Sequence, residues 1–110
     1  MGNNFVLANL TENEYITFLG YSKEFEIFCN KIPSQMVSYY LFEHNGSDIV
    51  FVGDQWNVGS VWVNFEALIS EYKDVTGEIL KEMLEEKIIT KEDLDRFCPS
   101  WEKRYIMGQM

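Results

Sequence analysis

The chain has 110 residues, a length that suits one domain with one hydrophobic core and leaves no room for separate cofactor and substrate domains. Apolar residues make up 46% and aromatic residues 15%, so the chain can bury enough surface to fold and intrinsic disorder is not expected. Its 18 Asp and Glu against 9 Lys and Arg give a net charge of −9, which repels nucleic-acid phosphates and anionic membranes. We therefore expect no direct binding to nucleic acid or membrane.

Localisation and redox state follow from what the sequence lacks. No stretch approaches the roughly 18 apolar residues of a membrane span, and residues 1–9 have no signal-peptide pattern, so we expect a cytoplasmic protein. Cys29 and Cys98 are far apart, without a CxxC spacing or clustered histidines. We expect free thiols, with a disulfide as the alternative, and no metal or cofactor.

The first third of the chain is expected to form two strands and one short helix. Phe5 to Leu10 is the first strand, and Thr11 with Glu14 forms a capping-box pattern that predicts a helix from Glu12 to Leu19. From Ser22 to Ile32 the pattern is ambiguous between a strand and one helical face, and we favour a strand.

A β-hairpin over residues 36–53 is the clearest local expectation. Met36 to Glu43 is rich in strand-forming residues, Asn45-Gly46 suits a tight turn, and Asp48 to Gly53 returns as a second strand. After a connection at Asp54 to Asn57, Val58 to Val63 is predicted to add a third antiparallel strand.

From Asn64 onward the apolar spacing becomes helical. Asn64 is a plausible N-cap for a first helix, whose apolar face comprises Phe65, Leu68, Ile69 and Tyr72. Thr76-Gly77 precedes an amphipathic helix with Ile79, Leu80, Met83, Leu84 and Ile88 on one side. Thr90 caps a short helix that Pro99 ends, and Trp101 and Tyr105 are expected to pin the tail to the body.

These elements predict an α+β fold: a small antiparallel sheet of three to four strands, with C-terminal helices packed on one face. Within a single domain, residues 1–63 would be mainly strands with one short helix, 64–98 helical and 99–110 a tail. The large aromatics are too many for one thin core, so some are expected in an exposed patch or a dimer contact. They are Tyr39, Phe51, Trp56 and Trp62.

No pattern of catalytic residues emerges. His44, the only histidine, precedes the predicted Asn45-Gly46 turn, where a general base could not be kept dry or oriented. Acidic neighbours such as Glu85 and Glu86 fit a solvated helix surface better than a tuned acid/base pair, and no glycine-rich phosphate loop or nucleophile elbow occurs. We expect a protein that is not an enzyme.

The acidic residues of the C-terminal half suggest a binding surface. Carboxylates along helices can imitate the charge of a nucleic-acid backbone and occupy the basic cleft of another protein. An ordinary solvated face is the alternative, since Lys73, Lys81 and Lys87 interrupt the run. The core of such a mimic would be Glu66, Glu71, Asp74, Glu78, Glu82, Glu85 and Glu86.

The segment Asp54 to Asn57 is a second candidate for partner binding. Polar groups around Trp56 on a loop suit a binding anchor, to which Asp54 would add a charge. The alternative is a tryptophan that folds back over the sheet edge.

Together these features favour a non-enzymatic binding protein that inhibits or adapts a macromolecular partner with a basic surface, such as a nuclease or a defence effector. Small size, acidity and missing catalytic motifs are shared with phage-encoded inhibitors of host defence and with immunity proteins that neutralise nucleases. Two alternatives remain: an accessory subunit that completes an oligomer, including a homodimer, and a small-ligand binder with an aromatic pocket.

Overall fold

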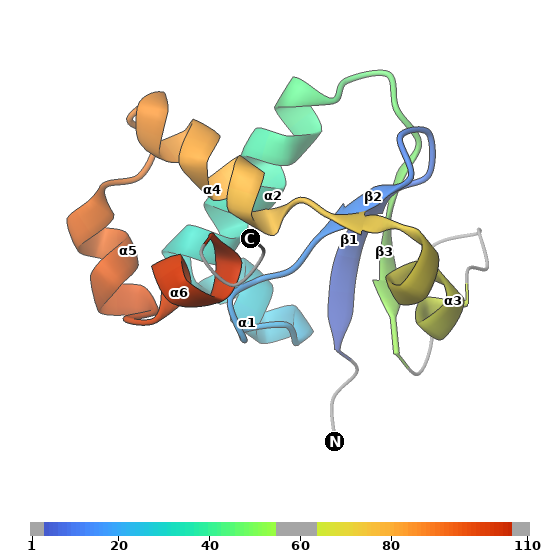
Figure 1. Cartoon of the computed structure of the whole chain (residues 1–110), viewed down its shortest axis with the longest axis horizontal. Coiled ribbons are helices and arrows are strands. Elements are labelled where there is room, and N and C mark those ends of the chain that lie inside the picture. Colours follow the sequence, from blue (N-terminus) through green and yellow to red (C-terminus); the bar gives the residue numbers. More distant parts are fainter. Residues whose placement is uncertain (1–3, 55–63, 107–110) are drawn as a thin grey trace.

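The computed structural model describes residues 4–54 and 64–106 and confirms the α+β class. Over these residues it contains a mixed four-stranded sheet and six helices (Figure 1). In chain order they are β1 (Phe5–Asn9), β2 (Glu14–Ile16), α1 (Glu24–Cys29), α2 (Lys31–Glu43), β3 (Ile49–Gly53), α3 (Phe65–Glu71), β4 (Lys73–Asp74), α4 (Thr76–Glu85), α5 (Lys91–Phe97) and α6 (Trp101–Tyr105).

The sheet is built around β1, in the order β3-β1-β2-β4. β1 pairs antiparallel with both neighbours, so that Leu7 lies opposite Ile16 on β2 and Phe51 on β3. All five β1 residues are buried, which explains its continuous apolar run. The predicted strands at the positions of β1 and β3 are confirmed, whereas the parallel pairing of β2 with β4 was not expected.

Helices cover both faces of this sheet. Leu7 and Ile16 face a larger core shared with α1, α2 and α4 to α6. Val6, Ala8 and Val52 face a smaller core against α3. The helices α4 to α6 thus share one face as predicted, while α3 lies on the other side of the sheet (Figure 1).

The predicted 36–53 hairpin is wrong, because residues 31–43 form the helix α2. Ile32, Met36 and Tyr40 recur at helical spacing along its buried side, and Pro33 sits in the first turn, where a missing amide hydrogen costs little. Burial of this helical face outweighs the strand preference of the individual residues. The local turn is still present, with Gly46 in the left-handed region at a φ of 102°.

The strand favoured for Ser22 to Ile32 is also wrong. This segment contains α1 and the start of α2, so both helices fall within the stretch predicted to be mainly strands. Ile27 is the buried residue of α1, whereas Phe25 and Phe28 are exposed. The alternation of apolar residues was misleading because the two phenylalanines do not belong to the core.

The helix predicted from Glu12 to Leu19 is a third error. Asn9, which is fully buried, accepts hydrogen bonds at Oδ1 from the backbone N–H groups of Thr11 and Glu12, at 3.0 and 2.9 Å. These bonds close a turn in which Asn13 is left-handed, with a φ of 57°, and β2 follows directly. The Thr11 and Glu14 pattern therefore lies in a β-hairpin between β1 and β2.

The C-terminal helices are confirmed. Asn64 caps α3 by accepting a hydrogen bond from the Ala67 N–H at 3.0 Å, and Thr90 caps α5 in the same way. Trp101 and Tyr105 are buried and hold α6, which lies within the predicted 99–110 tail, against the larger core.

The end of α4 differs from the prediction. The chain reverses at Lys87, whose φ is 60°, so Ile88 lies beyond the helix and is exposed, while Ile89 is buried.

The predicted strand from Val58 to Val63 lies outside the described residues. None of the helices in the described ranges is long and apolar enough to cross a bilayer.

Candidate partner-binding surface

Two adjacent tyrosines near the end of α2 gather carboxylates from two other elements. Tyr39 Oη donates a hydrogen bond to Glu82 Oε1 on α4 at 3.1 Å. Tyr40 Oη donates to Glu14 Oε2 on β2 at 2.5 Å. Both tyrosine side chains are buried in the larger core. The core thereby fixes where these two glutamates reach the surface.

Burial and nearby negative charge keep both hydroxyls protonated. Burial, followed by the hydrogen bond to Glu82, raises the pKa of Tyr39 from 10.0 to about 12, and Glu43 and Glu86 add to the rise. Burial also raises the pKa of Tyr40, and its hydrogen bond to Glu14 acts in the same direction. At neutral pH each tyrosine is therefore a hydrogen-bond donor that holds a carboxylate.

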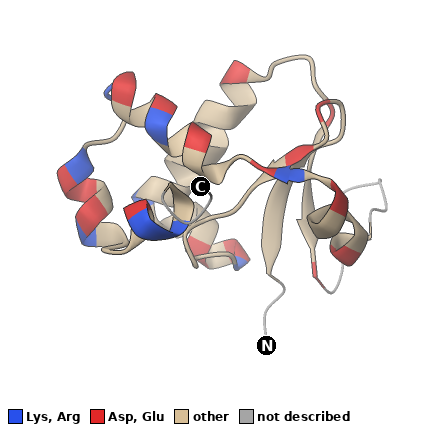
Figure 2. Ribbon diagram, in the orientation of Figure 1, with Lys and Arg blue, Asp and Glu red and all other residues tan. Residues whose placement is uncertain are grey.

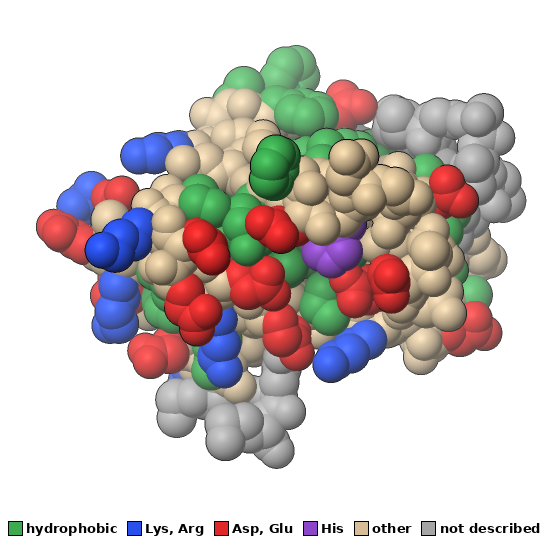
Figure 3. Space-filling view, turned by 90° about the horizontal axis from the view of Figure 1, so that it is seen from above, with side chains coloured by type: hydrophobic (Ala, Val, Ile, Leu, Met, Phe, Trp, Pro, Cys, Tyr) green, Lys and Arg blue, Asp and Glu red, His purple; other side chains and the backbone are tan. Residues whose placement is uncertain are grey.

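His44 lies beside this pair and is not at the exposed hairpin turn that the sequence suggested. It is the C-cap residue of α2, and its ring stacks on Tyr40 with centroids 4.0 Å apart. Its Nε2 lies 3.5 Å from Glu14 Oε2, and its side chain is 24% exposed. The imidazole therefore lies next to Glu14 and forms part of the same surface as the carboxylates (Figure 3).

Five carboxylates from three segments make up this surface, which we call the acidic face. Glu14 and Glu82 are held by the tyrosines, Glu43 and Glu86 act electrostatically on Tyr39, and Glu12 acts on Tyr40. Figure 3 shows carboxylates grouped around the histidine, with Lys and Arg side chains mainly at the margin of the group. The acidic face can attract a cationic surface and offers it two carboxylates that tyrosine hydroxyls hold in place, one half-buried (Glu14) and one exposed (Glu82).

Sequence reasoning found only part of the acidic face. Glu82 and Glu86 were predicted, but Glu12, Glu14 and Glu43 were missed because their segments were assigned to the wrong elements. Glu43 follows the helical spacing of Met36 and Tyr39 along α2, a signal that could have identified it.

The remaining predicted carboxylates are dispersed (Figure 2). Glu85 is exposed on α4, whereas Glu66 and Glu71 are exposed on α3, across the sheet from α4. The structure thus does not bring the predicted mimic core together as one row.

Two predicted acidic residues have structural partners. Asp54 accepts hydrogen bonds from the backbone N–H of Asn4 at 3.0 Å and from Asn4 Nδ2 at 3.1 Å, which ties the end of β3 to the start of β1. Asp74 accepts from the N–H and the hydroxyl of Thr76 at the start of α4. Trp56, the predicted anchor beside Asp54, lies outside the described residues.

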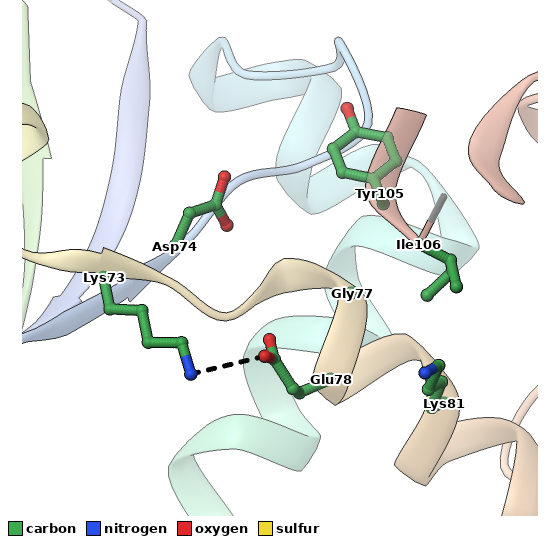
Figure 4. A pocket seen from close by; sticks show the side chains of 7 residues that line it. All are labelled: Lys73, Asp74, Gly77, Glu78, Lys81, Tyr105 and Ile106. Atoms are coloured by element: carbon green, nitrogen blue, oxygen red, sulfur yellow. Dashed lines mark ion pairs between the residues drawn. The ribbon is translucent and has the colours of Figure 1, made fainter. Parts of the chain in front are cut away.

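A cleft of about 560 Å³ lies between β4, α4 and α6 (Figure 4). It contains two lysines and two carboxylates, and the Lys73 Nζ to Glu78 Oε1 distance is 3.5 Å. Its one described aromatic ring is Tyr105, whose pKa is raised by burial. The four charges cancel, and both carboxylates have partners within the chain. The cleft therefore has no net charge that would favour an anionic or a cationic ligand. The described lining is Lys73, Asp74, Gly77, Glu78, Lys81, Tyr105 and Ile106.

The predicted aromatic patch can be followed at two of its four residues, and neither of these is fully exposed. Tyr39 is buried and Phe51 half-buried, while Trp56 and Trp62 lie outside the described residues. The large apolar side chains that are exposed among the described residues are Phe25, Phe28, Leu41, Phe42 and Ile88.

Both cysteines are free, as predicted: Cys29 is exposed and Cys98 buried. Within residues 4–54 and 64–106, no three His, Cys, Asp or Glu side chains cluster closely enough to hold a metal ion.

Comparisons with protein-family models, with curated proteins and with solved structures each find no match for this chain. Function must therefore be argued from the charge and geometry of the acidic face.

Proposed function

We propose that this protein is a non-enzymatic binding protein that inhibits or adapts a macromolecular partner by covering a basic surface of that partner. The observation that carries the proposal is the convergence of five glutamates from three segments on the end of α2, two of them fixed by buried tyrosines. Carboxylates that lie close together repel one another, so this cluster does not help the chain to fold. A cationic surface of a partner would relieve the repulsion, which favours a binding role for the cluster.

The fixed carboxylates support specific recognition beyond general acidity. Glu14 and Glu82 have lost part of their side-chain freedom to the tyrosine hydrogen bonds, so a partner arginine or lysine would find acceptors already in place. Arginine suits such acceptors best, since its planar guanidinium donates to a carboxylate in two parallel bonds. The partner class would be a basic nuclease or defence effector, as for anti-defence inhibitors and immunity proteins.

The test compares two variants of equal charge. Glu12→Gln/Glu43→Gln/Glu86→Gln neutralises exposed members of the acidic face and spares the two tyrosine hydrogen bonds. Glu66→Gln/Glu71→Gln/Glu102→Gln removes the same three charges from other exposed sites, so both proteins go from −9 to −6 (−9 + 3). Each is immobilised and exposed to lysate of the organism that encodes the chain.

We expect basic proteins retained by the wild type and by the control to be lost from the acidic-face variant. Raising the salt concentration from about 0.05 to about 0.5 M should release them, because it shortens the screening length to a few ångströms. Equal retention by both variants would refute the role of the acidic face. Retention that does not depend on salt would indicate apolar docking in its place.

A further inference from the structure

A separate apolar surface lies on α1 and its flanks. Phe25 is 81% exposed and Phe28 61% exposed, and Cys29 is exposed as well. These residues are spaced i, i+3 and i+4, so they form one stripe along a helix of only two turns. Exposed phenylalanines are uncommon on a protein surface, and adjacent ones commonly mark a contact site.

Beside this stripe is a notch of about 60 Å³ between α1 and the sheet. Its walls include Ile27, Phe28 and Phe51, and Glu24 stands among its lining residues. The Phe28 and Phe51 rings meet edge to face, with centroids 6.0 Å apart, so the notch has rigid aromatic walls. The α1 patch, defined as Phe25, Phe28, Cys29 and this notch, therefore presents a projecting ring next to an apolar depression.

The charge around the α1 patch differs from that of the whole chain. Between residues 23 and 31 there are two lysines, Lys23 and Lys31, and two glutamates, Glu24 and Glu26, which sum to zero (+2 − 2). Lys31 Nζ also lies 3.9 Å from Asp93 Oδ2 on α5, so the charge with this neighbour is −1 (+2 − 3). The chain as a whole carries −9. A second copy would be repelled from the acidic face but not from the α1 patch, whereas a basic partner would be drawn to the acidic face.

We infer that the α1 patch is a self-association surface, through which two copies of this chain pair about a two-fold axis. A two-fold interface uses the same patch on both subunits, so the patch must carry both the projection and the depression that receives it. Phe25 and the notch meet that requirement, and the exposed Lys23 of one copy can pair with the exposed Glu24 of the other. This inference does not depend on the proposed function, since the two surfaces share no residue.

Sedimentation equilibrium from about 5 to about 500 µM protein tests the pairing, a range that covers weak interfaces of small area. We expect a monomer–dimer equilibrium in the wild type that becomes stronger with added salt, because salt screens the repulsion between two acidic chains. Phe25→Ser should raise the dissociation constant at least about tenfold by removing the projecting ring. Phe42→Ser is the matched control, since Phe42 is also 81% exposed but lies on α2.

Cross-linking through Cys29 gives a second measurement. A short bismaleimide should join two wild-type copies at Cys29 and should fail to do so in Phe25→Ser, while Cys29→Ser controls for reaction at the buried Cys98. A wild-type protein that stays monomeric across the whole range would overturn the inference. So would a dimer that Phe42→Ser weakens as much as Phe25→Ser, or capture of a different protein by the α1 patch of a purely monomeric chain.

Discussion

The acidic face and the α1 patch use aromatic residues in opposite ways. In the acidic face, Tyr39 and Tyr40 are buried, and their hydroxyls hold Glu82 and Glu14. In the α1 patch, the ring of Phe25 is itself the exposed feature. The first surface is therefore coupled to the stability of the fold, while the second can be altered with little effect on folding. Substitutions in the two surfaces should therefore differ in their effect on the free energy of unfolding.

The largest difference in the free energy of unfolding should come from removing one aromatic ring from each surface. Tyr40→Ala deletes a fully buried side chain and should lower the free energy of unfolding by about 3–5 kcal/mol, or prevent cooperative folding. Phe25→Ala should change it by less than about 0.5 kcal/mol. Urea unfolding measures both, and similar losses in the two variants would contradict the distinction.

Removing one hydroxyl tests the hydrogen bond alone. Tyr40→Phe keeps the ring but removes the hydroxyl that donates to Glu14, and among the described residues only the contact with His44 Nε2 at 3.5 Å remains. This should cost about 1–3 kcal/mol because the acceptor is a charged and mostly buried carboxylate. Tyr21→Phe is the control, since that half-buried ring stacks on Phe97 and should lose less than about 0.5 kcal/mol. Equal losses of unfolding free energy in urea would show that the Tyr40–Glu14 hydrogen bond does not stabilise the fold.

Alkaline pH should destabilise the fold in part through Tyr39. The pKa of Tyr39 is raised from 10.0 to about 12 on folding, chiefly by burial, so between these pH values the folded state binds more protons than the unfolded state. The corresponding stability is fully present below pH 10 and is lost as the pH rises through about 12. Tyr39→Phe should make the fall in unfolding free energy over this window shallower. A slope identical to that of the wild type would contradict the burial of this hydroxyl.

The smallest effect concerns single charges. Glu86→Gln should stabilise the fold by up to about 0.5 kcal/mol at low salt, because it relieves repulsion with Glu43 and Glu82. Glu66→Gln on α3 should be neutral or slightly destabilising, since Glu66 lies in the first turn and interacts favourably with the helix dipole. Thermal unfolding at low and high salt measures both, and effects of the same sign would count against a repulsive acidic face.

Several elements could be predicted because their signals are local. The apolar run of β1, the caps at Asn64 and Thr90, and the amphipathic pattern of α4 depend on near neighbours in the chain. Net charge and the state of the two thiols also followed directly from the residues present.

The errors arose where distant contacts decided between two local possibilities. Residues 36–43 prefer strands individually, but the core formed with α4 and the sheet buries one helical side of α2. Asn9 forms the turn that replaced the predicted first helix only because β1 buries its side chain. Phe25 and Phe28 looked like core residues because sequence alone does not give exposure.

Composition and near-neighbour pattern thus determined that this chain is an acidic α+β protein with helices after its last long strand. Only the tertiary structure decided which carboxylates act together, because Glu14, Glu43 and Glu82 come from three separate elements. The hydroxyls of Tyr39 and Tyr40 hold Glu82 and Glu14, and these hydrogen bonds require that the core pack α2 close to both α4 and β2. The surface is therefore a consequence of packing, which no local sequence pattern records.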